Sequence, residues 1–369
     1  MVDENFAIVV GISRYKGGTE YPPLDGPLHD VAHICEWLTD PHGGNVKPAN
    51  IYRLTTPHDL IEPPQDGAPG AATWTPDQGA FIRAYQDITI ENGEYRRRDS
   101  RLYLYFSGHG FSQSADTTAR AALFAANAYG PARPNIPGTV YAEAAKRVAV
   151  FKEIVLIMDC CRDVQRNSPY AAYELDQTES GNAEKVKLFA MYASAKNGKA
   201  QEREFASQDK VFGLLTHGLV RALDEAPTNV LGQVSSTTLN NYLKINWETW
   251  CPPDYPPPQP PRTVPADAGD IFFGSRKTLF TQRFVVDGAV PPAVKLQSAG
   301  LDAVGTFGPD RIIWVERNDP EKIEIEFDIE DGRKRFALKL PPGEHTLTIP
   351  GAPERRLTFL PEATNDVRI

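Results

Sequence analysis

The chain of 369 residues carries a formal net charge of −9, with 41% hydrophobic and 24% charged residues. This composition is typical of a soluble globular protein rather than a disordered chain, and the length predicts one large domain or two ordinary ones. The acidic balance argues against nucleic acid or an anionic membrane as the main partner. The run Arg96–Arg98 is the local exception, and we interpret it as a solvated loop before a buried strand.

The cysteines are too few for a disulfide scaffold and wrongly spaced for a zinc site. There are four, at positions 35, 160, 161 and 251, and no CxxC pair occurs. The acidic N-terminal residues precede an apolar run too short for a signal peptide, and no segment is long enough to span a membrane. We therefore expect a cytoplasmic protein, because a reducing compartment keeps a thiol free to react.

The first half of the chain alternates between strand and helix patterns. Near-continuous apolar runs indicate strands that are buried on both faces, and the stretches between them space apolar residues as helices do. The predicted strands cover 6–12, 51–55, 101–106, 153–158 and 186–194, and the predicted helices cover 27–38, 75–88 and 142–150. Pro27 suits a first helical turn, and Thr75 is the expected cap of the second helix. Right-handed crossovers would place the strands in one mainly parallel sheet, with helices on both faces.

Polar and Pro-rich segments interrupt this pattern. The stretch 57–72 is predicted to be a surface insertion, and 164–185 a flexible linker. Two more helices are predicted over 213–223 and 237–250. The Pro-rich stretch 251–261 is interpreted as a stiff extended connection that returns the chain to the sheet, where 269–274 would supply a last strand.

From about residue 275 the pattern becomes that of a small β-domain. Short strands are predicted over 311–315, 322–327, 335–340 and 345–349. Asp331-Gly332 and Pro341–Gly343 separate the later ones, which predicts antiparallel hairpins and a small β-sandwich. We therefore expect an α/β domain over 1–275 and a β-rich accessory domain over 276–369.

Two strand-like runs end in reactive side chains. The run from Glu153 ends in Asp159-Cys160-Cys161-Arg162, and the run from Arg101 ends in Gly108-His109-Gly110. In parallel sheets, ligands bind beyond the carboxyl ends of the strands, so His109 and Cys161 can meet although they are 52 residues apart. Taken singly, each has an ordinary alternative, a turn histidine and a core thiol.

Together these two side chains suit acyl transfer. An imidazole can activate a thiol as a thiolate–imidazolium pair and can then deliver a proton to a leaving amine. Glycines on both sides of His109 let the backbone approach a substrate closely. The backbone N–H groups of Gly110 and Cys161 are the expected donors to an oxyanion.

The stretches 105–110 and 159–162 resemble the histidine and cysteine motifs of the caspase superfamily. Caspases place the histidine about 50 residues before the cysteine and follow the cysteine with Arg, Gln or Gly, as Arg162 follows Cys161 here. The resemblance covers roughly residues 3–275 and is strongest to metacaspases, paracaspases and bacterial caspase-like proteins. It implies a caspase-like fold and a cysteine endopeptidase. The Asp-x-Cys motif of metacaspases makes Cys161 the nucleophile and leaves Cys160 as a packed residue.

The same resemblance implies a preference for basic substrates. Asp159 stands where caspases have a glutamine, and Asp30 matches the second acid of the metacaspase pocket. Two acids around one side chain bind a cation and repel a carboxylate, so we expect cleavage after Arg or Lys. Glu202 or Glu204 could add negative charge. Asp30 also has an ordinary alternative, as a first-turn acid favoured by the helix dipole.

Partners and control are predicted in outline. We expect a protein or peptide substrate, no cofactor, no obligatory metal, no nucleic acid and no membrane partner. The segment 166–187 resembles in position the linker that caspases cut on activation, although a simple mobile loop is an equal alternative. The β-rich domain could bind a partner or regulator, and the family resemblance suggests stress, cell-death or defence signalling. The competing hypotheses are a catalytically silent caspase-fold scaffold and a hydrolase of another substrate.

Overall fold

The structure is a computed structural model that forms two compact units. One contains Met1–Ala222 with Asn240–Ile271, and the other Leu223–Leu239 with Phe272–Ile369. The described residues are all except 1–3, 57–74, 114–119, 166–168, 171–179, 195–198, 206–209, 230–231, 251–259, 276–279, 299–300, 317–318, 331, 341–342 and 360–365. The predicted surface insertion and most of the Pro-rich connection therefore lie outside the described residues.

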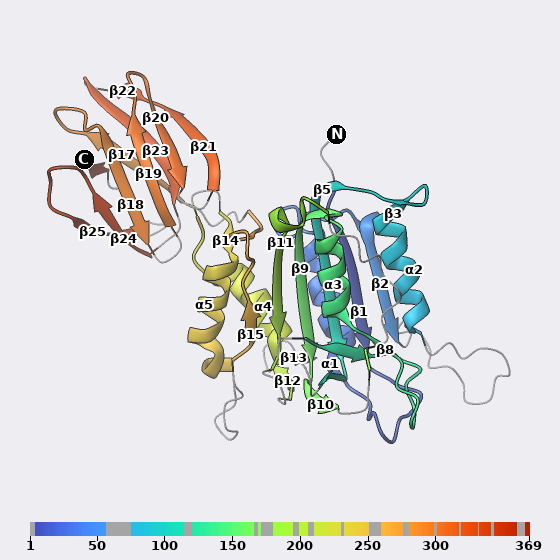
Figure 1. Cartoon of the computed structure of the whole chain (residues 1–369). Coiled ribbons are helices and arrows are strands. Elements are labelled where there is room, and N and C mark those ends of the chain that lie inside the picture. The colour runs from blue at the N-terminus through green and yellow to red at the C-terminus, as the bar shows by residue number, and fades with distance from the viewer. Residues whose placement is uncertain are drawn as a thin grey trace. The chain divides into compact units, whose positions relative to one another are not determined.

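A six-stranded sheet forms the centre of the first unit (Figure 1). Its order is β15-β11-β9-β5-β1-β2, and all neighbours are parallel except β15, which is antiparallel to β11. The bounds are β1 Phe6–Ile12, β2 Ile51–Thr56, β5 Arg98–Gly108, β9 Phe151–Cys160, β11 Lys187–Tyr192 and β15 Arg262–Val264. The predicted mainly parallel sheet is confirmed. In the β5–β9 register Ser107 pairs with Asp159, so the two reactive strand ends are level.

The last strand of the sheet was predicted wrongly. The edge strand is β15, whereas Phe272–Phe273 (β16) pairs with Val234–Ser235 (β14) in a separate two-stranded sheet. The stretches 262–264 and 272–273 are both short and have Gly or Pro nearby. The residue pattern of a strand does not by itself determine which strand it pairs with.

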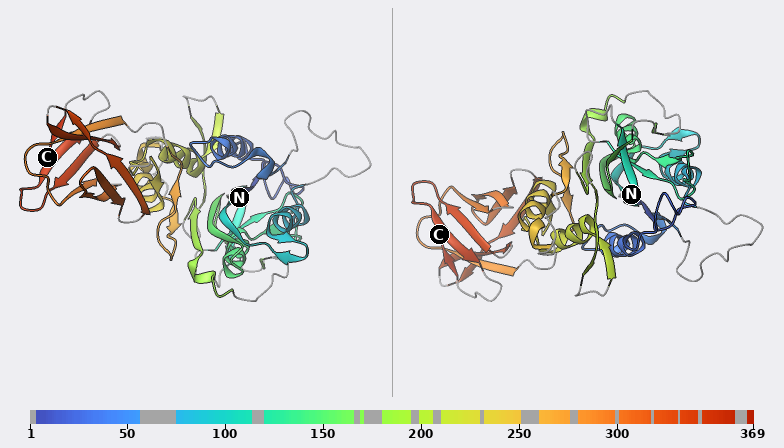
Figure 2. Two further views of the ribbon diagram at one scale, coloured as in Figure 1. Left: turned by 90° about the horizontal axis from the view of Figure 1, so that it is seen from above. Right: turned by 90° about the horizontal axis from the view of Figure 1, so that it is seen from below.

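Helices cover both faces of the central sheet. Figure 2 shows α2 (Gln78–Thr89) and α3 (Gly138–Arg147) on one face and α1 (Gly26–Thr39) on the other. On the α2 and α3 side, Phe81 and Tyr141 pack with alternate residues of the strands, such as Leu104. On the other face α1 lies so close to β1 that a Cβ on Gly11 would be 2.4 Å from Val31 Cγ2. Two further helices, α4 (Leu214–Glu225) and α5 (Ser236–Asn246), follow later in the chain.

The boundaries of α2 and α3 differ from the prediction. Asp77, not Thr75, caps α2, because its Oδ1 accepts the Ala80 N–H at 2.7 Å. Helix α3 begins four residues before Ala142, where Gly138 packs against the β5 and β9 side chains Phe106 and Met158. It ends before Ala149, whose positive φ of 52° breaks the helix.

Smaller elements surround the carboxyl end of the sheet. One four-stranded sheet has the order β10-β6-β7-β8, and a two-stranded sheet joins β12 to β13. Their bounds are β6 Gly110–Gln113, β7 Ala122–Phe124, β8 Asn135–Ile136, β10 Asp163–Gln165, β12 Glu202–Phe205 and β13 Lys210–Gly213, and the remaining short elements of this unit are β3 Ile90–Glu91, β4 Glu94–Tyr95, η1 Pro48–Asn50, η2 Ala183–Lys185 and η3 Trp247–Trp250. Thus β10 and η2 lie within the predicted linker 164–185, whose middle is outside the described residues.

The second unit contains two antiparallel β-sheets. Their orders are β22-β23-β17-β26 and β21-β20-β19-β18-β24-β25, with one parallel pair between β17 and β26. The bounds are β17 Phe280–Val286, β18 Ala293–Ser298, β19 Leu301–Phe307, β20 Arg311–Glu316, β21 Asp319–Glu326, β22 Asp328–Glu330, β23 Arg333–Leu340, β24 Gly343–Thr348, β25 Arg355–Phe359 and β26 Val367–Arg368. Phe284 and Phe336 of one sheet share a core with Leu296 and Trp314 of the other, as a sandwich requires.

One of the two predicted hairpins of this unit is wrong, and the other forms with a different first strand. The strands on either side of Asp331-Gly332, β22 and β23, pair antiparallel, but the first of them covers 328–330 and not 322–327. The stretch 335–340 lies in β23, which pairs with β22 and β17, whereas 345–349 begins in β24, which pairs with β18 and β25. The stretch 322–327 pairs through β21 with β20. Strands β23 and β24 are adjacent in sequence but lie in opposite sheets, because a sandwich can also be closed by crossing between its sheets.

Candidate active site

Contacts from Tyr15 and Pro22 hold His109 in place just after the end of β5. Gly108 has φ +146°, and a Cβ there would lie 2.6 Å from the hydroxyl oxygen of Tyr15. The His109 backbone N–H donates to that hydroxyl at 2.7 Å, and its Nε2 lies 2.8 Å from the carbonyl oxygen of Pro22. Because a carbonyl only accepts, Nε2 carries the proton and Nδ1 remains as the base.

The two neighbouring cysteines point to different sides of β9. Cys160 is fully buried, and a Cβ on Gly110 would lie 2.5 Å from its Sγ. Cys161 is half-buried, and its thiol is 3.9 Å from the carbonyl oxygen of Ala200. At the end of β9 the chain thus has a packed thiol, Cys160, followed by a more accessible one, Cys161.

His109 and Cys161 line one cavity of about 220 Å³ at the carboxyl end of the sheet. Its walls also include both predicted substrate-binding acids. The lining residues are Leu24, Asp30, Ser107, Gly108, His109, Asp159, Cys161, Ala200, Gln201, Glu202 and Gly213. Gly110 packs against Cys160 and is not among these described lining residues, so its role as an oxyanion donor stays a prediction.

Asp30 and Asp159 are both buried in the wall of this cavity. Asp30 accepts the Ser107 hydroxyl at 2.8 Å and the Gly213 N–H at 2.9 Å, on different oxygens. Asp159 Oδ2 accepts the backbone N–H of Thr216 at 2.9 Å and its hydroxyl at 2.6 Å. The first turn of α1 holds no acidic residue, so Asp30 is not the dipole-stabilised acid of the alternative interpretation.

The carboxyl groups of Asp30 and Asp159 both lie next to Gly213, and they repel each other. Burial, and then repulsion from Asp159, raise the pKa of Asp30 well above its usual range. Burial raises the pKa of Asp159 to about 6. A Cβ on Gly213 would lie 2.2 Å from Asp159 Oδ2 and 3.0 Å from Asp30 Oδ2, so only glycine fits between the acids. A site that concentrates buried carboxyl groups in this way favours a cationic ligand.

Glu202, and not Glu204, is the third acid of the cavity wall. Glu204 is exposed, whereas the Glu202 carboxylate accepts the backbone N–H of Asp25 at 3.1 Å, just before α1. Burial raises the pKa of Glu202, and bonds from Asp25 and Gly26 oppose that rise. An acid at a helix N-terminus is favoured by the helix dipole, so Glu202 also joins β12 to α1.

The resting thiol and imidazole are shifted away from an ion pair. Burial raises the pKa of Cys161, and burial lowers the pKa of His109. Both directions favour the neutral forms, contrary to the thiolate–imidazolium pair expected from the sequence. Cys161 in this state needs a general base when it attacks.

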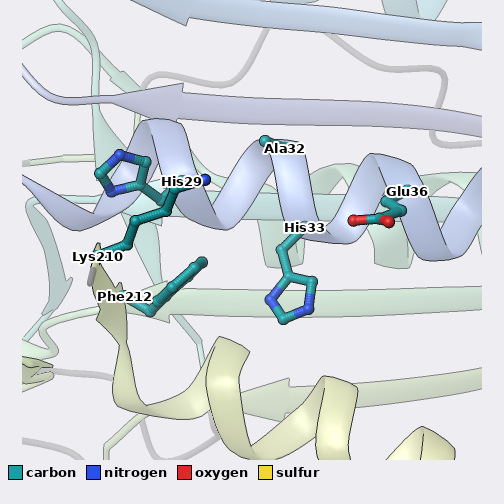
Figure 3. A pocket seen from close by; sticks show the side chains of 6 residues that line it. All are labelled: His29, Ala32, His33, Glu36, Lys210 and Phe212. Atoms are coloured by element: carbon teal, nitrogen blue, oxygen red, sulfur yellow. The ribbon is translucent and has the colours of Figure 1, made fainter. Parts of the chain in front are cut away.

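A second cavity of about 280 Å³ lies on the outer face of α1. Figure 3 shows His29 and His33 of α1 near Phe212, with Lys210 beside His29 and Glu36 further along α1. His29 Nδ1 lies 2.9 Å from the carbonyl oxygen of Val211, which ties α1 to β13. Among the described residues, no cluster of three or more His, Cys, Asp or Glu side chains is arranged to hold a metal ion, either in this cavity or elsewhere.

Several residues that shape the site gave no signal in the sequence. Tyr15 and Pro22 act on His109, while Ser107, Gly213 and Thr216 hold the two acids. Pro22 acts through its carbonyl and Gly213 through its N–H and its lack of a side chain, features that every chain position or every glycine shares. Only the tertiary structure distinguishes them.

A family model described as a caspase domain matches residues 4–244, more than half of the chain. The chain belongs to this caspase domain family. The predicted family and α/β fold are thereby confirmed, and a peptidase family is the coarse functional assignment.

None of the described helices has the length and apolar character needed to cross a membrane.

A curated relative supports this assignment to a peptidase family. A protein from a Desulfuromonadales bacterium, described as a probable protease, is 28% identical over 232 residues. The match covers 60% of this chain and 26% of that protein, so the chain spans about a quarter of the relative's length.

Proposed function

We propose that this caspase-family chain is a cysteine endopeptidase that cleaves after Arg or Lys, with Cys161 as nucleophile and His109 as base. The observation that carries the proposal is one cavity that contains His109, Cys161 and three acids, with no Arg or Lys among its described lining residues. A thiol and an imidazole alone would fit many acyl transfers. The acids add a reason to choose a cationic side chain.

The proposed reaction uses a neutral resting pair. As the Cys161 Sγ attacks the scissile carbonyl carbon, its proton passes to His109 Nδ1, and the carbonyl oxygen becomes an oxyanion. The backbone N–H groups of Cys161 and Gly110 are the proposed donors to this oxyanion. His109 then gives the proton to the leaving amine, and water attacks the acyl-enzyme with His109 as base. The Pro22 carbonyl stabilises imidazolium as it forms, because it accepts the Nε2 proton.

Substrate choice follows from the charges of the cavity wall. Both Thr216 bonds use Asp159 Oδ2, which leaves Oδ1 for a ligand. An entering guanidinium or ammonium group lowers the pKa of Asp30 and Asp159 and relieves their mutual repulsion. A substrate aspartate would add a fourth acid to Asp30, Asp159 and Glu202, so we propose that it is rejected.

The wider roles are proposed from the family and the chain organisation. We propose a peptidase domain over 1–275 and a β-rich domain over 276–369 that binds a partner or regulator. Action in the cytoplasm would keep the free thiol of Cys161 reduced, and stress, cell-death or defence signalling is the proposed setting. Self-cleavage in the linker could use Arg166 or Lys185. Lys187 is unsuited, because it begins β11 and its Nζ bonds to the Asp270 carbonyl at 2.7 Å.

Fluorogenic peptides ending in Arg, Lys or Asp test the proposal on the full chain, beside a Cys161→Ala variant. We expect cleavage of the Arg and Lys peptides only, and none by the variant. Cleavage of the Asp peptide alone would contradict the specificity. If no peptide is cut and an Arg-based electrophile fails to label Cys161, the silent scaffold is the better hypothesis.

A further inference from the structure

Tyr15 packs against the imidazole of His109. It follows β1, and its side chain is buried. Its hydroxyl accepts the His109 backbone N–H at 2.7 Å, and its ring centroid is 5.2 Å from that of the imidazole. Tyr15 therefore contacts both the backbone and the ring of the proposed base, although it does not line the cavity.

The fit between Tyr15 and the end of β5 leaves no room for adjustment. A Cβ on Gly108 would lie 2.6 Å from the Tyr15 hydroxyl oxygen and 3.1 Å from the Ile12 carbonyl. Gly108 also has φ +146°, which L side chains rarely adopt. The hydroxyl thus occupies space that only a glycine at position 108 leaves open, and the backbone before His109 is set by that contact.

The segment that carries Tyr15 also holds the other side of the imidazole. Seven residues later, Pro22 accepts the Nε2 proton at 2.8 Å, and the ring of Tyr21 lies 6.2 Å from the imidazole. Backbone bonds fix this segment to its surroundings, from Lys16 N–H to the Ala126 carbonyl, from Gly17 N–H to the Ala128 carbonyl and from Leu24 N–H to the Ser13 carbonyl. One anchored segment therefore holds His109 at its backbone and at its ring.

We propose that Tyr15 is a positioning residue for His109: its hydroxyl fixes the His109 backbone so that Nε2 meets Pro22 and Nδ1 is directed to the Cys161 proton. The inference rests on the proposed thiol–imidazole chemistry. A misplacement of about 1 Å in a proton acceptor costs rate with little effect on substrate binding. Tyr15 acts through His109 and does not touch the substrate.

Loss of the hydroxyl has a predictable effect on the imidazole. The His109 N–H would lose its buried acceptor, and the ring would gain contact with water. Burial, which lowers the pKa of His109, is the larger influence, and the bond to the Pro22 carbonyl, which raises it, is the smaller one. Loosening of both therefore gives a net rise of this pKa toward the ordinary value. The titratable groups around His109 are Tyr21 from the same segment, Cys161 from the end of β9, and Asp30, Asp159 and Glu202 from the cavity wall, and none of them is altered.

Tyr15→Phe in the full chain tests the proposal, with Tyr85→Phe as the matched control. Tyr85 is also a buried tyrosine whose hydroxyl bonds to backbone, the Tyr141 carbonyl at 3.2 Å, but it lies in α2, away from the cavity. For Tyr15→Phe we expect kcat on Arg peptides to fall about 10-fold with KM within about 2-fold. By NMR of ¹³C-histidine-labelled protein, assigned with His109→Ala, the His109 pKa should rise toward its ordinary value. Tyr85→Phe should change neither quantity.

If Tyr15→Phe and Tyr85→Phe behave alike, the proposal is overturned. Loss of the hydroxyl of a purely structural core tyrosine lowers Tm but leaves kcat and the His109 titration unchanged. If Tyr15→Phe does not fold, 3-fluorotyrosine placed at position 15 alone keeps the shape and weakens the acceptor, and an unchanged His109 titration would then refute the role. The NMR arm needs no substrate. A wild-type protein that cleaves no peptide and is not labelled at Cys161 by an Arg-based electrophile would defeat the proposed function, while a shifted His109 titration would still support the role of Tyr15.

Discussion

The cavity at the end of the central sheet and the core of the β-sandwich bury opposite kinds of side chain. The cavity wall holds Asp30, Asp159 and Glu202, and burial raises the pKa of each. The sandwich core is apolar, built around Phe284, Trp314 and other hydrophobic residues. Burying a charge costs stability, whereas burying apolar surface supplies it. The comparison indicates that the sandwich core is built for stability, while the cavity accepts a cost that a cationic ligand can offset.

The largest expected effect is the loss of chemistry at Cys161. Cys161→Ala should lower kcat/KM on Arg peptides by at least about 10³-fold, because no nucleophile remains. The fold should be retained, which a thermal melt would check. The neighbouring variant Cys160→Ala is the control and should keep its rate within a few-fold. An active Cys161→Ala variant, or an inactive but folded Cys160→Ala variant, would contradict the assignment of the two thiols.

The next effect separates function from stability in the cavity. Asp159→Asn keeps an oxygen for the Thr216 donors but removes the charge, so kcat/KM on Arg peptides should fall about 100-fold. The Tm should hold or rise, because the repulsion between Asp159 and Asp30 is gone. Asp87→Asn, at an exposed position of α2 outside the cavity, should leave both quantities unchanged. A fall in Tm with unchanged kinetics would make Asp159 a structural acid only.

The sandwich should show the reverse behaviour. Trp314 is almost fully buried, so Trp314→Ala should lower the free energy of unfolding by about 3–5 kcal/mol, measured by denaturant titration. Ile329 is 74% exposed, and Ile329→Ala should change it by less than about 0.5 kcal/mol. None of the described residues that line the cavity comes from this unit, so peptide cleavage by folded Trp314→Ala should match the wild type. A large kinetic defect in that variant would break the contrast between the two regions.

The smallest expected effect is a pair of opposite pH dependences from Asp159. Its folded-state pKa of about 6 exceeds the ordinary value of about 3.9, so between these values the folded protein binds more protons than the unfolded chain. Stability should therefore fall as pH rises through this window, on the order of 2 kcal/mol. Cleavage of Arg peptides should rise over the same window, as Asp159 ionises.

Calorimetry and kcat/KM measured between about pH 4 and 7 would check both trends. Asp159→Asn should flatten the stability trend, and any pH dependence of its residual cleavage belongs to His109. Wild-type cleavage that stays level as pH falls through 6 would rule out a role for ionised Asp159.

The sequence by itself determined the five parallel strands of the central sheet and placed His109 and Cys161 just beyond the ends of two of them. Buried parallel strands are read from local apolar runs, and their carboxyl ends share one edge, so these runs predict that His109 and Cys161 meet. Family motifs added Asp30 and Asp159. The β-domain was predicted as a class, but the partners of its strands were not, because many short strands of similar pattern can pair with one another.

Only the tertiary structure decided how the site is held. Tyr15 lies 94 residues from His109 in the chain, Pro22 lies 87 residues away, and the Asp30–Gly213 bond spans 183 residues. These contacts use a hydroxyl, a carbonyl and a backbone N–H, groups that carry no pattern in the sequence. They form because the packing of α1, β5 and β13 brings distant backbone together, and long-range packing is not encoded in local periodicity.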